Sequence, residues 1–127
     1  MSILGIGTDL VKIGRIEAVL SRHRERFIER CFTVSEAEDF QIRAKKEFAT
    51  MVAGRWAAKE AFLKAIGGNI SNIPYHDISV VRDANGAPLL EARGAASVAF
   101  SARGGQRAHL SISHEKEYAI ALVIIES

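Results

Sequence analysis

The alternation of apolar and polar positions predicts that strands and helices follow one another along this chain. Residues 3–9 form a short apolar run that is typical of a strand. Apolar side chains then recur at helical spacing over residues 13–20, and a second short helical segment carries Phe27. A further helix is predicted to begin at a capping box, in which Ser35 is followed three residues later by Glu38.

The longest helix is predicted over residues 46–66, and Gly67 and Gly68 end it. After Pro74 the apolar positions change to a period of two, and Asn85-Gly86 predicts a hairpin turn. The later elements are predicted as strands around residues 78–80 and 90, a helix at 94–103, and strands at about 109–113 and 118–126. This order predicts an α+β fold, in which one domain (residues 1–127) packs a largely antiparallel sheet on the long helix.

Composition excludes some functional classes. The 127 residues suffice for one domain that buries about two thirds of the surface exposed by its unfolded form. The formal net charge of +2 argues against a general nucleic-acid binder, and no apolar stretch approaches the roughly 20 residues that cross a bilayer. The single cysteine, Cys31, cannot form an internal disulfide, and the first apolar run lacks the form of a secretory signal. These features predict a cytoplasmic protein that binds neither nucleic acid nor membranes.

Two carboxylates stand in unusual places. On the long helix, Glu60 and Lys64 are one turn apart, and Arg55 and Lys59 precede them on what we expect to be the same face. Such a face can hold a divalent cation beside a polyphosphate, although a solvent-facing ion pair would look the same in the sequence. Asp9 interrupts the first apolar run, where two glycines allow another backbone or a ligand to approach closely, and is either a helix cap or a ligand.

The two segments that carry these carboxylates resemble the signature of the phosphopantetheinyl transferases. The matching motifs are Gly7-Thr8-Asp9 and Trp56-Ala57-Ala58-Lys59-Glu60-Ala61-Phe62-Leu63-Lys64. The resemblance is greatest to the small holo-acyl carrier protein synthases and runs nearly end to end, through Asn85-Gly86-Ala87-Pro88, Ser111-Ile112-Ser113-His114 and the C-terminal segment. A departure occurs at Gly67-Gly68-Asn69, where the family usually has Gly-Thr-Gly.

The resemblance implies a phosphopantetheinyl transferase-like fold and a defined reaction. A serine of apo acyl carrier protein would receive the 4'-phosphopantetheine group of coenzyme A, and adenosine 3',5'-bisphosphate would leave, as a step of fatty acid biosynthesis. Asp9 and Glu60 would bind Mg²⁺, and Lys64 would hold the pyrophosphate, which makes these three the expected catalytic residues. The serine proton would pass either to Glu60 or to a water on the metal ion.

The resemblance also implies which residues bind coenzyme A and which oligomer the protein forms. Residues expected to contact coenzyme A are Arg55, Lys64, Gly67, Ser113 and His114. The family forms homotrimers with sites between neighbours, so we expect Asp9 and Glu60 to lie near another chain. From the sequence alone, an arginine on a helix such as Arg55 is more often an ordinary surface residue, and His114 is equally compatible with a hydrogen-bonded surface position.

A basic segment bears on the protein partner. Residues 12–30 carry six basic and three acidic side chains, an excess of +3, which by itself is also typical of a solvated helix face. In the family this region resembles the docking helix for the acidic acyl carrier protein. We therefore expect Arg15, Arg22 and Arg26 to contact the carrier, with Phe27 as an apolar anchor.

Two other functions remain compatible with these residues. A non-catalytic module could use the same basic helix to bind an acidic carrier protein, with Asp9 and Glu60 in structural roles. A metal-dependent phosphohydrolase could instead release phosphate from coenzyme A without any carrier.

Overall fold

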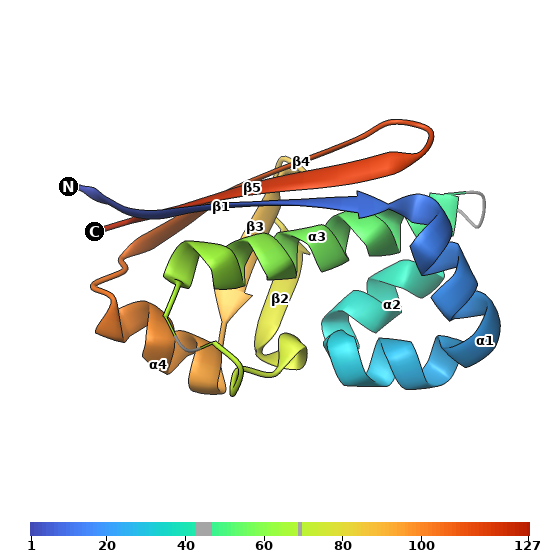
Figure 1. Ribbon diagram of the computed structural model, residues 1–127, viewed down its shortest axis with the longest axis horizontal. Coiled ribbons are helices and arrows are strands. Elements are labelled where there is room, and N and C mark those ends of the chain that lie inside the picture. The colour runs from blue at the N-terminus through green and yellow to red at the C-terminus, as the bar shows by residue number, and fades with distance from the viewer. Residues whose placement is uncertain (43–46, 69) are drawn as a thin grey trace.

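A computed structural model describes residues 1–42, 47–68 and 70–127 of the chain (Figure 1). Its elements are, in chain order, β1 (Ile3–Lys12), α1 (Ile13–Cys31), α2 (Val34–Ile42), α3 (Phe48–Ile66), the short 3-10 helix η2 (Tyr75–Asp77), β2 (Ile78–Arg82), β3 (Pro88–Ala92), α4 (Gly94–Ala102), β4 (Arg107–His114) and β5 (Tyr118–Glu126). The predicted α+β class is confirmed, and so is the order of the elements. Within the described ranges, no helix is both long and apolar enough to cross a membrane.

The strands form two antiparallel groups around the long helix α3. The larger sheet has the order β1-β5-β4 and lies along one side of α3, whereas the β2–β3 hairpin runs steeply across the helix (Figure 1). The expectation of one largely antiparallel sheet is therefore correct in strand direction, but the hairpin forms a separate two-stranded sheet.

Two glycines bring β1 directly onto the backbone of α3. A Cβ atom added to Gly5 would lie 1.9 Å from the carbonyl oxygen of Ala65, and one added to Gly7 would lie 2.0 Å from that of Ala61. No other residue fits at this spacing, because real side chains never come so close to a carbonyl oxygen. The strand can therefore run along the helix, and the next residue on the same side of β1 is Asp9.

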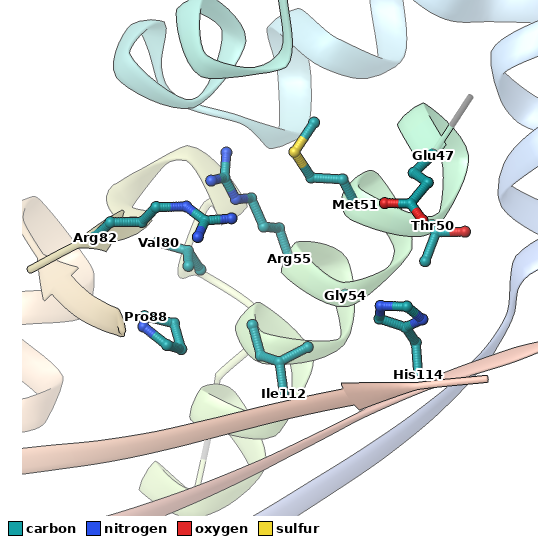
Figure 2. A pocket seen from close by; sticks show the side chains of 10 residues that line it. All are labelled: Glu47, Thr50, Met51, Gly54, Arg55, Val80, Arg82, Pro88, Ile112 and His114. Atoms are coloured by element: carbon teal, nitrogen blue, oxygen red, sulfur yellow. The ribbon is translucent and has the colours of Figure 1, made fainter. Parts of the chain in front are cut away.

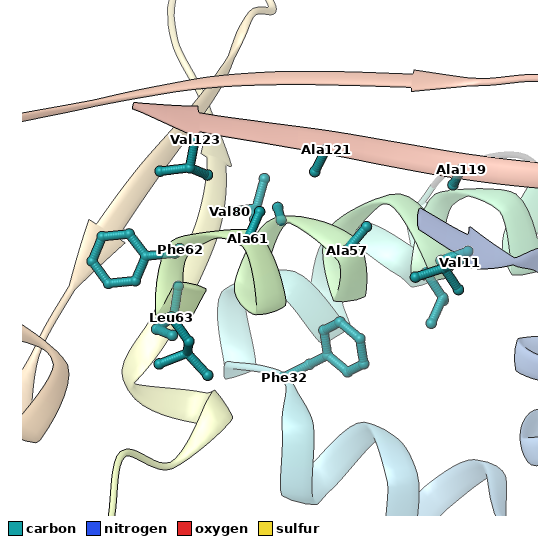
Figure 3. Packing of buried hydrophobic residues seen from close by; sticks show 14 of the residues in the cluster. Val11, Phe32, Ala57, Ala61, Phe62, Leu63, Val80, Ala119, Ala121 and Val123 are labelled. Carbon is teal, nitrogen blue, oxygen red and sulfur yellow. The ribbon is translucent and has the colours of Figure 1, made fainter. Parts of the chain in front are cut away.

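Small side chains also set the distance between α3 and the sheet. The alanines of β5, Ala119 and Ala121, lie over Ala57 and Ala61 of the helix, and all four are fully buried (Figure 3). Larger side chains such as Phe62 fill the space at the edges of this contact. Close packing of this kind fixes the helix rotation, since few alternative arrangements bury the same surface.

Helix α2 begins at a different capping box from the one predicted. The hydroxyl of Thr33 accepts a hydrogen bond from the Glu36 backbone N–H (3.2 Å), and the Glu36 carboxylate accepts one from the Thr33 backbone N–H (3.0 Å). The prediction of Ser35 with Glu38 was therefore wrong by two residues. Thr33 and Glu36 are both buried, whereas Ser35 and Glu38 are exposed, so burial against the core selects the pair.

The first helical region behaves as two pieces, as the pattern predicted. Helix α1 buries Ile13, Ile16 and Leu20 and is broken at His23, whose backbone is not helical (φ −141°, ψ 39°). Helix α3 ends at Gly67 in the positive-φ region, which confirms the predicted stop. The predicted start of the long helix at residue 46 lies outside the described residues.

Candidate active site

The structure brings Asp9, Glu60 and Lys64 to one place on α3. The side chain of Asp9 is on the helix-facing side of β1, because its strand partner Ala121 is fully buried there. The Lys64 ammonium donates a hydrogen bond to Asp9 Oδ1 (3.1 Å) and another to the carbonyl oxygen of Thr8 (3.0 Å). The Asp9 side chain is 17% exposed and that of Lys64 54%, so the group opens to solvent.

Tyr75 joins this group and was not predicted from the sequence. Its hydroxyl donates a hydrogen bond to Glu60 Oε1 (2.9 Å). Burial of the phenol, together with the hydrogen bond to Glu60 and the charges of Glu60 and Asp9, raises the pKa of Tyr75 to about 12. Both carboxylates therefore act on the same hydroxyl, which remains a donor at neutral pH. No motif marks Tyr75, because a tyrosine after a proline in a loop fits many structures.

Lys59 does not share the face of Glu60, in contrast to the prediction. Its side chain is fully buried and pairs with Glu36 Oε1 of α2 at 2.6 Å. Its ammonium also donates to the carbonyl oxygens of Tyr75 (3.2 Å) and Ile78. Burial lowers the pKa of Lys59, and the charge of Glu36 opposes that shift. Lys59 therefore belongs to a buried ion pair, and its contacts join α3 to α2, η2 and β2.

Arg55 also points away from the Asp9 group. Its guanidinium, with 5% side-chain exposure, forms an ion pair with Asp39 of α2 and lies over the ring of Phe40, with its central carbon 5.0 Å from the ring centroid. Its Nη1 atom is buried and has no hydrogen-bond partner among the described residues. A buried cationic donor without a partner is costly, and an anion placed beside it would satisfy it.

A cavity of about 360 Å³ is lined by Arg55 and His114 (Figure 2). Its lining comes from α3, β2, β3 and β4 and consists of Glu47, Thr50, Met51, Gly54, Arg55, Val80, Arg82, Pro88, Ile112 and His114. The volume is in the range of small-ligand sites, and Arg55, Arg82 and His114 give it basic character. Arg55 and His114 were predicted as coenzyme A contacts, and this cavity brings them together.

Gly67 and Ser113 lie apart from that cavity. Gly67 follows the last residue of α3, where its backbone N–H donates to the carbonyl oxygen of Leu63. Ser113 lies between two cavity-lining residues of β4 and therefore faces the opposite side of the sheet, where its strand partner Ile120 is exposed. Within one chain, Ser113 could not touch a ligand in this cavity, and its predicted role remains untested.

The donors near Asp9 fit a magnesium ion that is shared with a phosphate. No group of three or more His, Cys, Asp or Glu side chains suited to a metal occurs in the part of the chain that the structure describes. Asp9 and Glu60 supply only two carboxylates. Mg²⁺ in phosphate-handling sites is bound by one or two carboxylates, with waters and substrate oxygens completing the octahedron. The pair suits such a shared ion better than a protein-enclosed metal.

The predicted carrier contacts lie on α1. Arg15, Arg22 and Arg26 are exposed. Phe27 is half-buried, and its ring centroid lies 5.6 Å from those of Phe32 and Trp56. Phe27 thus packs within its own chain as well as facing outward.

Arg26 and Phe27 also line an open cavity between α1 and η2. Trp56 and Tyr75 form part of the same cavity, which links the surface of α1 to the tyrosine that contacts Glu60. Cys31 is half-buried there, and burial raises the pKa of its thiol, which disfavours a nucleophilic role.

Comparisons with known proteins show which family the sequence resembles. Residues 5–123 match the family model described as the 4'-phosphopantetheinyl transferase superfamily. A holo-[acyl-carrier-protein] synthase of Aliivibrio salmonicida is 42% identical over 100% of both chains.

Solved structures agree as well. A holo-[acyl-carrier-protein] synthase from Neisseria meningitidis has a TM-score of 0.90 and 34% identity, covering 99% of this chain and 100% of its own. A Bacillus anthracis synthase in complex with coenzyme A (3',5'-ADP) has a TM-score of 0.81 and 37% identity, covering 98% of this chain and 97% of its own. On sequence and fold together, the chain belongs to the holo-acyl carrier protein synthase family of the 4'-phosphopantetheinyl transferase superfamily.

Proposed function

We infer that this protein transfers the 4'-phosphopantetheine group of coenzyme A to a serine of apo acyl carrier protein, as a step of fatty acid biosynthesis in the cytoplasm. The observation that carries the inference is the meeting of Asp9, Glu60 and Lys64 in a chain that matches holo-acyl carrier protein synthases over its full length. A single half-buried cysteine without a disulfide is consistent with the cytoplasm.

In the proposed reaction, the serine oxygen forms a bond to the β-phosphorus of coenzyme A. The bond between that phosphorus and the bridging oxygen breaks, and adenosine 3',5'-bisphosphate leaves. Asp9 and Glu60 would hold Mg²⁺, which when bound supplies positive charge to the phosphate oxygens. Lys64, held beside Asp9, would hold the pyrophosphate, and the serine proton would pass to Glu60 or to water.

The basic cavity is the proposed seat of the nucleotide end of coenzyme A. The Arg55 Nη1 atom, which has no hydrogen-bond partner in the part of the chain that the structure describes, suits a phosphate oxygen, and His114 lines the same cavity. Arg55 and Glu60 are five residues apart on α3, which separates them by about 140° around the helix axis. This angle favours a site completed by two chains, in which one supplies Glu60 and its neighbour supplies Arg55.

An apolar sheet face supports the proposed homotrimer. On the side of the β1-β5-β4 sheet that faces away from α3, Ile6, Leu10, Ile120 and Leu122 are 59, 63, 42 and 37% exposed. Such contiguous apolar exposure marks an interaction surface. We propose that copies of this chain cover it in the trimer, which would also bring Ser113 of one chain against its neighbour.

The change Leu10→Lys is expected to break the trimer into monomers, because it places a charge in an apolar contact. Sedimentation equilibrium should give the mass of one chain for the variant and of three chains for the wild type. The control Val98→Lys alters an apolar residue that is at least as exposed (70%) on α4, away from this face, and should leave the trimer intact. A trimeric Leu10 variant, or a monomeric wild type, would contradict the proposal.

The intact mass of a purified apo acyl carrier protein tests the reaction. After incubation with this protein, coenzyme A and Mg²⁺, the carrier should gain about 340 Da, one phosphopantetheine group, and EDTA should suppress the gain. Carrier binding without any gain would favour the non-catalytic module. Release of phosphate from coenzyme A in the absence of carrier would favour the phosphohydrolase.

The change Arg22→Glu is expected to raise the KM for the carrier about tenfold and to flatten its salt dependence, because Arg22 is exposed on the basic helix α1. Steady-state kinetics at several ionic strengths would measure both effects. The matched control is Arg93→Glu, an exposed position before α4 with the same change in net charge. An equal rise in KM in both variants would show a general charge effect and would refute the docking role of Arg22.

A further inference from the structure

Tyr75 contacts the proposed metal-binding carboxylate through a single atom. Its hydroxyl lies 2.9 Å from Glu60 Oε1 and donates the hydrogen bond, because a carboxylate can only accept. The contact occupies one of the two carboxylate oxygens and limits rotation of the group.

The position of Tyr75 is itself fixed from two sides. Its ring packs against that of Trp56, with centroids 4.5 Å apart and an interplanar angle of 38°. Its carbonyl oxygen accepts a hydrogen bond from the buried Lys59 ammonium (3.2 Å), which also binds the carbonyl oxygen of Ile78. Lys59 is held in turn by Glu36 at 2.6 Å. The η2 turn therefore cannot move without disturbing a fully buried ion pair.

Lys59 and Glu60 are adjacent in the chain but act on opposite ends of the same tyrosine. Lys59 donates a hydrogen bond to the Tyr75 backbone carbonyl inside the core, and Glu60 accepts one from the Tyr75 hydroxyl at the surface of α3. These contacts run from α3 to η2 and back to α3, so they leave the Glu60 side chain little conformational freedom. A residue that hydrogen-bonds a metal-binding carboxylate raises the metal affinity, because the carboxylate then loses less conformational freedom when the metal ion binds.

We propose that Tyr75 is a positioning residue that orients Glu60 for the metal ion, with Lys59 and Trp56 holding the tyrosine in place. The inference rests on the proposed role of Glu60 as a metal ligand. Tyr75 need not touch coenzyme A or the carrier serine to act in this way. Its contribution should therefore appear in metal affinity and turnover, and not in the KM for the carrier.

The change Tyr75→Phe tests this proposal, because it removes the hydroxyl and keeps the ring that packs on Trp56. Mn²⁺ is titrated into the protein saturated with coenzyme A, and free Mn²⁺ is followed by electron paramagnetic resonance. We expect about tenfold weaker Mn²⁺ binding and about a tenfold higher Mg²⁺ requirement for turnover, as is typical for a residue behind a metal ligand. The melting temperature and the carrier KM should stay near those of wild type.

Two further variants make the result decisive. Tyr118→Phe removes the hydroxyl of the only other tyrosine, on β5, and should leave Mn²⁺ binding unchanged. Glu60→Gln should weaken Mn²⁺ binding more than Tyr75→Phe does. If Glu60→Gln weakens binding and Tyr75→Phe does not, the positioning role is refuted while the metal role of Glu60 stands. If Glu60→Gln has no effect, the metal assignment fails and the inference fails with it.

Discussion

Replacement of Glu60 by Gln, or of Asp9 by Asn, is expected to lower the turnover of carrier modification about a thousandfold or more. Each change keeps the shape of the side chain and removes one of the two anionic donors that would hold the magnesium ion. A bound metal ion contributes several kcal/mol of transition-state stabilisation, and each 1.4 kcal/mol is about tenfold in rate. Only Asp9 and Glu60 supply carboxylates here, so neither loss has an obvious substitute among the described residues.

The measurement is the rate of carrier mass gain at saturating coenzyme A, together with the thermal unfolding midpoint and the affinity for the carrier. The last two should remain near the wild-type values, because both carboxylates are partly exposed and neither belongs to the basic helix α1. Glu38→Gln, the same kind of change at an exposed position of α2, is the control and should keep full activity. Wild-type turnover at ordinary Mg²⁺ in either site variant would remove that residue from the ligand set.

Replacement of Lys59 by Met is expected to lower the free energy of unfolding by about 3–5 kcal/mol, the usual cost of breaking a buried ion pair by removing one partner. Glu36 would remain fully buried without its cation. The carbonyl oxygens of Tyr75 and Ile78 would also lose their donor. Methionine has nearly the same length as lysine, so the effect would come from charge and hydrogen bonding and not from a cavity.

Urea denaturation followed by circular dichroism measures this loss as a lower midpoint with an unchanged slope. Lys64→Met is the matched control: the same substitution five residues later on the same helix, at a side chain that is 54% exposed. Its ion pair with Asp9 is near the surface and is expected to contribute no more than about 1 kcal/mol. Similar stabilities for the two variants would show that the Lys59–Glu36 pair is not the structural centre inferred from its burial.

Much of the fold could be predicted from local sequence patterns. The prediction was wrong where the sequence offered two equivalent motifs close together. The glycines near Asp9 predicted the close approach of a backbone or a ligand, and Gly5 and Gly7 lie against the backbone of α3. The capping box of α2 was misplaced because Ser35 and Thr33 are each followed by a glutamate at the required spacing. Contacts with distant residues decide between them: Glu36 pairs with the buried Lys59, 23 positions away, and also accepts a hydrogen bond from the Val80 backbone N–H.

Some features of the candidate site could likewise be predicted from the sequence, and others could not. By itself, the sequence determined the α+β class, the order of the elements and the candidate residues Asp9, Glu60 and Lys64, because periodicity, glycine spacing and local motifs are written in neighbouring residues. Only the tertiary structure decided that Lys59 is buried against α2 and that Tyr75 reaches Glu60. Helical periodicity states which residues share a face, but the face that enters the core depends on which distant segment covers it, and that is set by packing of the whole chain.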